Sequence, residues 1–214
     1  MNATVPIGIA AIGALLLAAR RAGAAVDRRR GPAAARDGRS GPLPSPEIRA
    51  LIEREAVVQG VPPEVALAFA ELESGFNPRA FGDRDWASRR PKQWSELLSR
   101  MPNNPAIDAP GVWGSYGLFG LLAAYHVQPD EHPNVLWDPA RNVQRGVTAI
   151  KHALQRTKGD TEQARLLYVG CGADGENCSP GYAASVVARF RNALIRWRAM
   201  SATNLAEAVP NGHR

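Results

Sequence analysis

Residues 62–80 read PPEVALAFAELESGFNPRA and contain the strongest structural signal in the chain. The two prolines followed by Glu64 are typical of a helix start, and Gly75 is a typical helix end. Between them, the stretch from Val65 to Ser74 is apolar nearly all round the helix. A helix of this kind is buried, so this stretch predicts the centre of a helical domain.

Helix signals of the same kind recur on both sides of this stretch. Ser45-Pro46-Glu47 combines an N-cap serine with a proline at the first helical position. Start signals, apolar faces and stop signals together predict four further helices, at residues 46–60, 138–157, 160–168 and 182–200. No convincing set of alternating strands is present, so the predicted fold is mostly α.

The chain begins with a long apolar stretch. Nothing charged precedes Arg20, and residues 5–19 are almost wholly apolar, which is typical of a membrane-directed segment of borderline spanning length. Arginines follow this apolar run, whereas a secretory signal carries its positive charge before it. Under the positive-inside rule, a cellular anchor of this form would leave the following domain in the cytoplasm.

These signals divide the chain into four parts. We predict a hydrophobic membrane-directed segment at residues 1–22, an Arg/Pro/Gly-rich linker at 23–45, a folded domain at 46–200 and a C-terminal tail at 201–214. Residues 1–45 hold seven arginines and two aspartates, and thus most of the formal charge of +6. The rest of the chain has 19 basic and 18 acidic residues, so we expect no specific nucleic-acid partner.

The chain has two cysteines, Cys171 and Cys178, seven positions apart in a loop rich in Gly, Asp, Asn and Pro. This spacing favours a short disulfide, which would place the domain in an oxidising compartment. The alternative is a pair of free thiols. The four histidines are scattered and none forms a ligand pair with a cysteine, so we expect no metal site.

Glu73 is the strongest candidate for chemistry. It lies in the last turn of the buried helix, where the helix dipole is negative and Phe69, Leu72 and Phe76 limit solvation. Both effects disfavour the ionised carboxylate, and a carboxyl group that keeps its proton near neutral pH can protonate a glycosidic oxygen. Glu71 lies about 200° away round the helix, so the two carboxylates do not form a catalytic pair.

Five segments along the chain carry a family resemblance. The first is ELESGFNPRA at residues 71–80, and the others are GSYGLFGLL (114–122), DPARNVQRGVTAI (138–150), LLYVGCG (166–172) and GYAASVVARF (181–190). In this order they resemble the motifs of the lytic transglycosylases of soluble-transglycosylase type, relatives of goose-type lysozyme. Together they cover most of the chain from Pro46 to about Trp197.

The resemblance implies a lysozyme-like helical domain with a cleft for peptidoglycan glycan strands of alternating N-acetylglucosamine and N-acetylmuramic acid. It implies that Glu73 is the catalytic acid. Glu73 would protonate the leaving oxygen and then help to remove the proton of the muramic acid C6 hydroxyl, giving a 1,6-anhydro product with no metal or organic cofactor. Tyr168 matches the family's tyrosine near the acid, whose hydroxyl can orient the carboxyl or support developing charge.

The resemblance also predicts the substrate-binding cleft, with Tyr116 and Phe119 as candidate walls. The expected substrate-binding residues are Ser74, Gly114, Tyr116, Gly117, Leu118 and Phe119. Asn142 and Gly146 are expected to hold their helix in place. Two positions depart from the family pattern, because Gly120 stands in place of a glutamine and Val169 in place of an asparagine, which removes two polar groups.

Residues 81–113 form an insertion, longer than the short connection of the family, with a small helix predicted near residues 94–100. Long loops beside a site often carry function. Trp86 and Trp94 could therefore stack on sugar faces. The alternative is that Trp94 and its apolar neighbours simply pack the insertion onto the domain.

Two other functions stay open at this stage. Asp83 or Asp85 could position a water molecule, which would make the protein a goose-type muramidase. Alternatively, it could be a weakly active or inactive structural protein of a virion or secretion machine, which the missing polar groups at Gly120 and Val169 favour. We expect the protein at the periplasmic side of the cell envelope, held by a membrane or a large assembly through its N-terminal segment, or alternatively in a virus particle that delivers it to a host envelope. The periplasmic location conflicts with the positive-inside rule unless the rule is overridden, the N-terminus is an unusual targeting segment, or a route such as a virus particle brings the protein to the wall.

Overall fold

The computed structural model describes residues 43–208, with side chains through Ala202. This part of the chain is mostly helical, as the sequence predicts. The hydrophobic segment at 1–22 and nearly all of the linker lie outside the described residues. None of the described helices combines the length and the apolar character needed to span a membrane.

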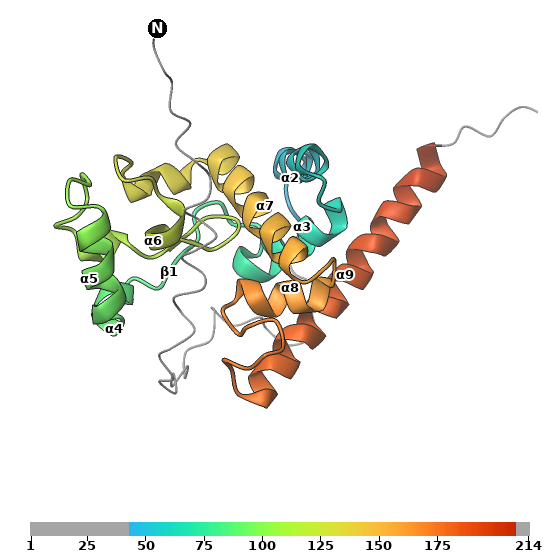
Figure 1. The fold of residues 1–214 in the computed structure, drawn as a ribbon. Helices are drawn as coiled ribbons and strands as arrows, with labels where there is room; N and C mark the ends of the chain where they lie inside the picture. The colour runs from blue at the N-terminus through green and yellow to red at the C-terminus, as the bar shows by residue number, and fades with distance from the viewer. Residues whose placement is uncertain (1–42, 209–214) are drawn as a thin grey trace, which may run out of the picture. The chain divides into compact units, whose positions relative to one another are not determined.

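Five of the described helices have ten or more residues, and the other elements are shorter (Figure 1). The α-helices are α2 (Pro46–Gln59), α3 (Pro63–Ser74), α4 (Trp86–Arg89), α5 (Pro91–Arg100), α6 (Ala123–His126), α7 (Pro139–Arg156), α8 (Thr161–Tyr168) and α9 (Pro180–Ala208). The 3-10 helices are η2 (Pro110–Val112) and η3 (Pro133–Trp137), and the strands are β1 (Phe81–Gly82), β2 (Ser115–Tyr116) and β3 (Leu121–Leu122).

Local caps set several of these helix boundaries, as predicted. Ser45 caps α2 by accepting a hydrogen bond from the backbone N–H of Ile48, and Gly60 ends the helix in the left-handed conformation at φ 73°. Asp138 and Asp160 cap α7 and α8 in the same way, each accepting from backbone N–H groups of the first turn. The predictions for these termini are therefore confirmed.

Helix α3 lies in the core, which confirms the prediction from its apolar sequence. Its residues from Val65 to Ala70 are buried, and it packs against α2 and α9. The Phe69 ring meets the Phe190 ring of α9 edge-on, with their centroids 5.1 Å apart. This packing fixes the position of the C-terminal end of α3, where Glu73 lies.

The last helix is longer than predicted. It begins at Pro180 and continues to Ala208, so the first eight residues of the predicted tail are helical. Helix formers such as Leu205, Ala206 and Glu207 continue the helix, and Pro210 is the first residue beyond it that cannot. The prediction that the helix ends at Met200 was wrong for this reason.

A small antiparallel sheet, which the sequence did not predict, joins the insertion to the block at 114–122. Its strand order is β1-β2-β3, with Gly82 opposite Ser115 and Ser115 opposite Leu122. Strands of two residues are too short to produce a visible alternation of apolar and polar residues. The turn between β2 and β3, residues 117–120, approaches the side chain of Glu73.

The insertion contributes to the main core. Trp86, Leu97, Met101 and Trp113 are buried, and they belong to the same apolar cluster as α3. Trp94 is partly buried, and its ring contacts those of Trp86 and Trp113 at centroid distances of 6.4 and 6.0 Å. In Figure 1, α4 and α5 lie on the opposite side of the described domain from α9. The tryptophans thus pack the insertion onto the domain, which is the simpler of the two predicted roles.

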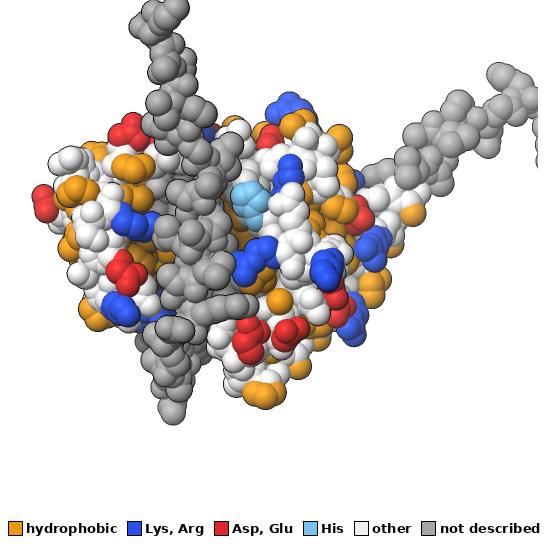
Figure 2. Space-filling view, viewed as in Figure 1, with side chains coloured by type: hydrophobic (Ala, Val, Ile, Leu, Met, Phe, Trp, Pro, Cys, Tyr) orange, Lys and Arg blue, Asp and Glu red, His pale blue; other side chains and the backbone are white. Residues whose placement is uncertain are grey.

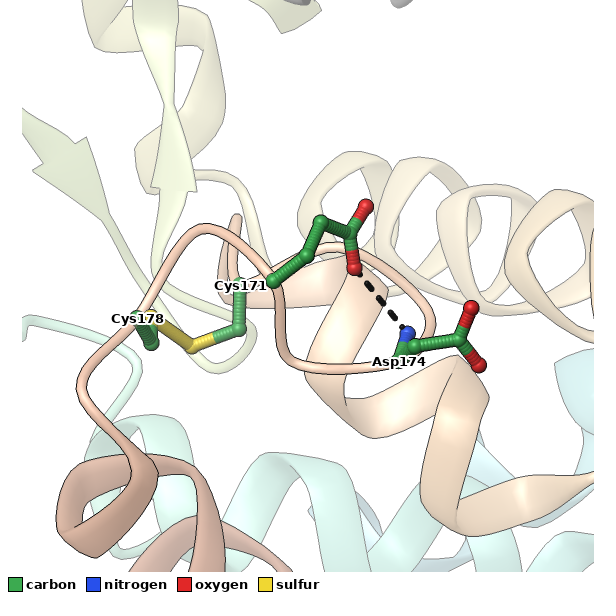
Figure 3. The surroundings of a disulfide bond; sticks show 4 residues. Cys171, Asp174 and Cys178 are labelled. Carbon is green, nitrogen blue, oxygen red and sulfur yellow. Dashed lines mark hydrogen bonds between the residues drawn. A yellow bond between two sulfur atoms is a disulfide. The ribbon is translucent and has the colours of Figure 1, made fainter. Parts of the chain in front are cut away.

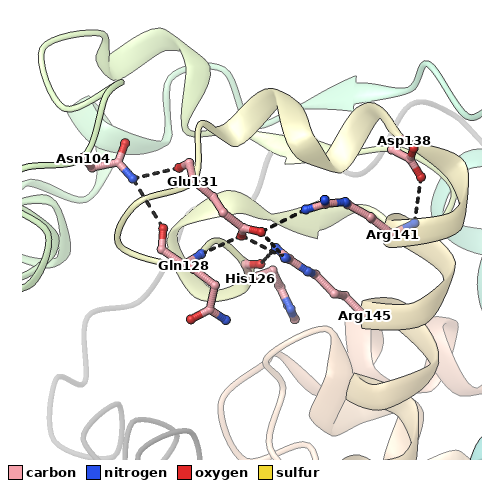
Figure 4. Close-up of polar contacts among 7 residues, drawn as sticks. All are labelled: Asn104, His126, Gln128, Glu131, Asp138, Arg141 and Arg145. Atoms are coloured by element: carbon pink, nitrogen blue, oxygen red, sulfur yellow. Dashed lines mark hydrogen bonds and ion pairs between the residues drawn. The ribbon is translucent and has the colours of Figure 1, made fainter.

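A polar cluster around Glu131 fastens the insertion to α7 (Figure 4). The Arg145 guanidinium donates to both carboxylate oxygens of Glu131, at 2.7 and 2.8 Å, and Arg141 donates to one of them. Asn104 of the insertion donates to the backbone carbonyl of Glu131. Hydrogen bonds from Arg145 lower the pKa of Glu131, while partial burial opposes this shift. Each charged group in this cluster therefore has a partner.

The surface of the described domain carries mixed charge. Figure 2 shows basic and acidic side chains interspersed on the face in view. This distribution agrees with the near balance of basic and acidic residues after Ser45. A single-sign stripe, which would indicate a nucleic-acid surface, is not seen among the described residues of this face.

Candidate active site

Glu73 lies one residue before the end of α3, and Gly75 then turns the chain away at φ 60°. Its side chain is 18% exposed, so the carboxylate lies at the edge of the core. Glu71 points in another direction, towards α9, where its carboxylate accepts hydrogen bonds from Arg196 and from the Trp197 indole at 2.8 Å. The structure thus gives the two carboxylates separate surroundings, as predicted from their spacing.

Arg165 of α8 is the basic side chain that contacts Glu73 within the described residues. Its Nη1 lies 2.5 Å from Oε1 of Glu73, and the arginine side chain is 7% exposed. The guanidinium carbon lies 5.2 Å from the Phe69 ring centroid and 5.9 Å from that of Tyr168. The guanidinium is therefore held between two aromatic rings and the carboxylate.

Arg165 was not singled out from the sequence, from which only apolar neighbours of Glu73 were expected. The structure corrects this expectation, because the buried Arg165 guanidinium contacts the carboxylate. One signal could have found the residue. Arg165 precedes Tyr168 by three positions on a helix, so the two side chains share a face.

Tyr168 lies beside Glu73 but does not donate to it. Its hydroxyl donates instead to the backbone carbonyl of Phe119, at 2.7 Å, and its ring meets Phe69 edge-on. Burial raises the pKa of Tyr168 well above its ordinary value, the charge of Glu73 raises it further, and Arg165 partly offsets both. The phenol therefore keeps its proton and holds the 117–120 turn, whereas the resemblance led us to expect that it orients the carboxyl or supports developing charge. The second of these roles stays a prediction.

The 117–120 turn is held from two sides. Asn142 of α7 donates to the carbonyls of Tyr116 and Leu136 and accepts from the N–H of Phe119, at 2.9, 3.1 and 3.0 Å. On the other side, the Ser74 hydroxyl lies 2.8 Å from the carbonyl oxygen of Leu118. Ser74 therefore fixes the turn beside the acid, and Asn142 anchors the turn as well as its own helix.

Gly120 brings its backbone against the Glu73 carboxylate. A Cβ atom built on Gly120 would lie 2.7 Å from Oε2 of Glu73, and the residue has a φ of 57°. Both facts favour glycine here, because a side chain would collide with the carboxylate and strain the backbone. The motifs that this chain resembles have a glutamine at this position. The glycine found here accompanies a close approach between the 117–120 turn and the Glu73 carboxylate.

The aromatic residues predicted as cleft walls lie in the core. Tyr116 and Phe119 are 1% and 0% exposed, and Leu118 is also fully buried. Tyr116 donates its hydroxyl to the Val112 carbonyl, and burial raises its pKa to about 12. These buried side chains therefore support the 117–120 turn from the core and do not offer open walls to a ligand. This corrects the prediction that Tyr116 and Phe119 form the walls of the cleft.

Close packing also requires glycine at three further positions, two in the segment 114–122 and one in α7. A Cβ on Gly114 would lie 2.3 Å from the Gly82 carbonyl oxygen of β1, and one on Gly117 would lie 2.5 Å from Nδ2 of Asn142. A Cβ on Gly146 would collide with the Phe119 ring. These positions set the path of the backbone that reaches Glu73.

Asp83 and Asp85 lie at the start of the insertion and are engaged by nearby groups. Asp83 accepts from the Ser115 hydroxyl at 2.7 Å and from Arg89 at 2.8 Å, and Asp85 pairs with Arg89 at 2.9 Å. Ser115 begins the strand that leads into the 117–120 turn. Asp83 is therefore linked to the sheet beside the site, while Asp85 is exposed and bound to its own loop.

The disulfide between Cys171 and Cys178 is present, which confirms that prediction. It closes the loop between α8 and α9 (Figure 3). Cys171 is buried, and it forms a small apolar cluster with Leu166 and Val186. This loop follows Tyr168 directly, so the disulfide supports the C-terminal end of the helix that carries Arg165 and Tyr168.

The site combines one carboxylate, one guanidinium, one phenol and the backbone of a tight turn. Residues 43–208 contain no group of three or more His, Cys, Asp or Glu side chains that could hold a metal ion. The chain was also compared with known proteins. No protein-family model, curated protein or solved structure matches it.

Proposed function

We propose that this protein is a peptidoglycan lytic transglycosylase that cleaves the bond between N-acetylmuramic acid and N-acetylglucosamine. The observation that carries the proposal is the setting of Glu73, a partly exposed carboxyl at the end of a buried helix, packed between Arg165 and the backbone of Gly120. The resemblance of residues 71–80 and of four later segments to the family motifs supplies the substrate class.

The proposed reaction uses one carboxyl group twice. Neutral Glu73 gives its proton to the glycosidic oxygen, and the electron pair of the breaking C–O bond stays with that oxygen. The C6 hydroxyl oxygen of the muramic acid bonds to the anomeric carbon, and its proton passes to the Glu73 carboxylate. The products are a free sugar hydroxyl and a 1,6-anhydro end, and Glu73 is neutral again.

The arrangement of carboxylates supports this route over general hydrolysis. Inverting and retaining glycosidases normally use two carboxyl groups that flank the scissile bond. Glu71 cannot be the second one, because it is bound to Arg196 and Trp197 on α9. An intramolecular attack by the C6 hydroxyl needs no second carboxylate.

A goose-type muramidase is the second candidate, and Asp83 is the observation that favours it. Asp83 lies next to β1, and its carboxylate accepts from Ser115 on the neighbouring strand β2. A carboxylate beside the sheet could serve as a base for water on the far face of the sugar. In that mechanism Asp83 would be as necessary as Glu73.

The cellular setting follows from the substrate. Peptidoglycan lies outside the cytoplasmic membrane, and a disulfide is typical of proteins in such oxidising compartments. We therefore place the protein at the periplasmic side of the cell envelope, attached through its N-terminal segment to a membrane or to a large assembly such as a virus particle that delivers it to a host envelope.

The deciding experiment is mass spectrometry of the muropeptides released from purified peptidoglycan by the full chain. Glu73→Gln and Asp83→Asn are the matched variants, because each removes one carboxylate and keeps the side-chain size. We expect anhydro-muramic ends from the natural chain and from Asp83→Asn, and none from Glu73→Gln. Reducing ends that disappear in both variants would establish the muramidase. No release by any of the three proteins would indicate a structural role.

A further inference from the structure

Arg165 is an unusual neighbour for a carboxyl group that must carry a proton. Its Nη1 is bound to Oε1 of Glu73, whereas its Nε is buried and has no hydrogen-bond partner among the described residues. A buried guanidinium with an unsatisfied donor costs free energy. Such costs are commonly found at functional sites.

The groups that face Glu73 come from three elements. Helix α8 contributes Arg165 and Tyr168, and the 117–120 turn contributes the backbone of Gly120, which has no charge. On α3 itself, the nearest acidic residue is Glu71, which is neutralised by Arg196 of α9. The phenol of Tyr168 keeps its proton, so Arg165 supplies the charge that acts on Glu73.

The two oxygens of Glu73 have different surroundings. Oε1 accepts from Arg165, which has donors alone, and Oε2 faces Gly120. The proton of the neutral acid therefore belongs on Oε2. Gly120 leaves room there, because any side chain at that position would meet Oε2 first.

We infer that Arg165 is a positioning residue that fixes Oε1 of Glu73 and stabilises the carboxylate formed when Oε2 gives up its proton. This inference rests on the proposed function of Glu73 as the acid. The rate of cleavage should therefore depend on both the charge and the planar geometry of the Arg165 guanidinium.

The test is the kcat and KM of muropeptide release by the full chain, compared with Arg165→Met and Arg165→Lys. Methionine is unbranched and carries no charge, so we expect kcat to fall about tenfold with little change in KM, because the contact acts on the carboxylate formed during the reaction. Lysine keeps the charge but lacks the planar fork, so it should restore part of kcat. An Arg165→Met variant with the kcat of the natural chain would overturn the inference.

A second readout does not depend on cleavage. The coupling between Glu73 and Arg165 is measured by urea unfolding of the natural chain, Glu73→Gln, Arg165→Met and the double variant Glu73→Gln/Arg165→Met at one pH. If Arg165 holds the carboxylate, Arg165→Met should cost less stability in the Glu73→Gln background than in the natural chain. The double variant, which removes both charges, also checks that the fold tolerates methionine.

The two readouts separate the inference from the proposed function. If the natural chain releases no muropeptide but the two substitutions are coupled in stability, the proposed function fails and the contact between Arg165 and Glu73 stands. If the natural chain cleaves glycan, kcat is unchanged in Arg165→Met and the two substitutions are not coupled, the proposed function stands and the role of Arg165 fails.

Discussion

Among the arginine–glutamate pairs of this protein, those at Glu131 and at Glu73 are built in different ways. At Glu131, Arg145 binds both carboxylate oxygens, Arg141 adds another hydrogen bond, and the side chains of Arg145 and Glu131 are each 20% exposed. At Glu73, Arg165 makes one short contact, is more deeply buried and leaves its Nε without a partner among the described residues.

The difference indicates that arginine–glutamate pairs have two different roles in this protein. A fully paired cluster stabilises one arrangement, and the Glu131 cluster does this for the insertion and α7. A pair with one contact leaves the second carboxylate oxygen available for another partner. We therefore expect changes at Glu131 to affect stability, and changes at Glu73 to affect activity.

The largest effect is expected for Glu73→Gln. Loss of the acid should lower the rate of glycan cleavage by about 10³-fold. The free energy of unfolding should change by no more than about 1 kcal/mol, because the glutamine carbonyl still accepts from Arg165. Rates of muropeptide release and urea unfolding at neutral pH measure the two quantities. Glu131→Gln is the control, and the comparison fails if it lowers the rate per folded molecule as much as Glu73→Gln does.

Asn142→Ala should affect both regions, because α7 carries Asn142 as well as Arg141 and Arg145. Removing the amide leaves the N–H of Phe119 and the carbonyls of Tyr116 and Leu136 without this partner. We expect a loss of about 3 kcal/mol in stability, measured by urea unfolding, and a decrease in activity as the 117–120 turn shifts. The exposed Asn134→Ala is the matched control and should change neither. Full activity in folded Asn142→Ala would show that the position of the turn is unimportant.

Removal of the disulfide tests whether the loop after Tyr168 contributes to stability, as the Glu131 cluster does. The double variant Cys171→Ser/Cys178→Ser should lose about 2 kcal/mol of stability, because a short closed loop restricts the unfolded chain. Thermal unfolding with and without reductant provides the measurement. Activity per folded molecule should be retained, since Arg165 and Tyr168 are held at the site by their own contacts with Glu73 and Phe119. Free reaction of both thiols in the native protein would contradict the disulfide itself.

The smallest effect is expected for Glu131→Gln, about 1 to 2 kcal/mol at neutral pH. Because the pKa of Glu131 is lowered in the folded protein, its stabilisation is fully present above the unfolded value of about 4.3 and is lost as the pH falls through the folded value. The difference between natural chain and variant should therefore shrink in acid. Urea unfolding at neutral and at acidic pH measures it, and an equal difference at both would exclude the ion pair as its cause.

Local sequence signals were sufficient for the boundaries of α2, α3, α7 and α8, whereas α4, α6 and the two 3-10 helices were not predicted. Ser45, Gly60, Asp138 and Asp160 act on their own first or last turns, so their effects can be predicted without knowing the fold. The three strands could not be predicted in this way, because each has two residues and exists only through pairing with distant segments. The length of α9 was missed because no strong stop signal follows Met200.

The candidate site was predicted in part. Glu73 and Tyr168 were singled out, and the structure brings both to the 117–120 turn. The bonding of Tyr168 and the burial of Tyr116 and Phe119 differ from the prediction. These details depend on how the turn packs against α7 and α8, for which no local pattern exists.

The sequence by itself determined that the described chain is mostly helical, that α3 is buried with Glu73 near its end, and that the two cysteines can close a short loop. These properties depend on residues close to one another along the chain. Only the tertiary structure decided that Arg165 pairs with Glu73, that Gly120 meets its other oxygen and that Asn142 holds the turn. The physical reason is that these contacts join residues 23 to 92 positions apart, which become neighbours once the helices pack.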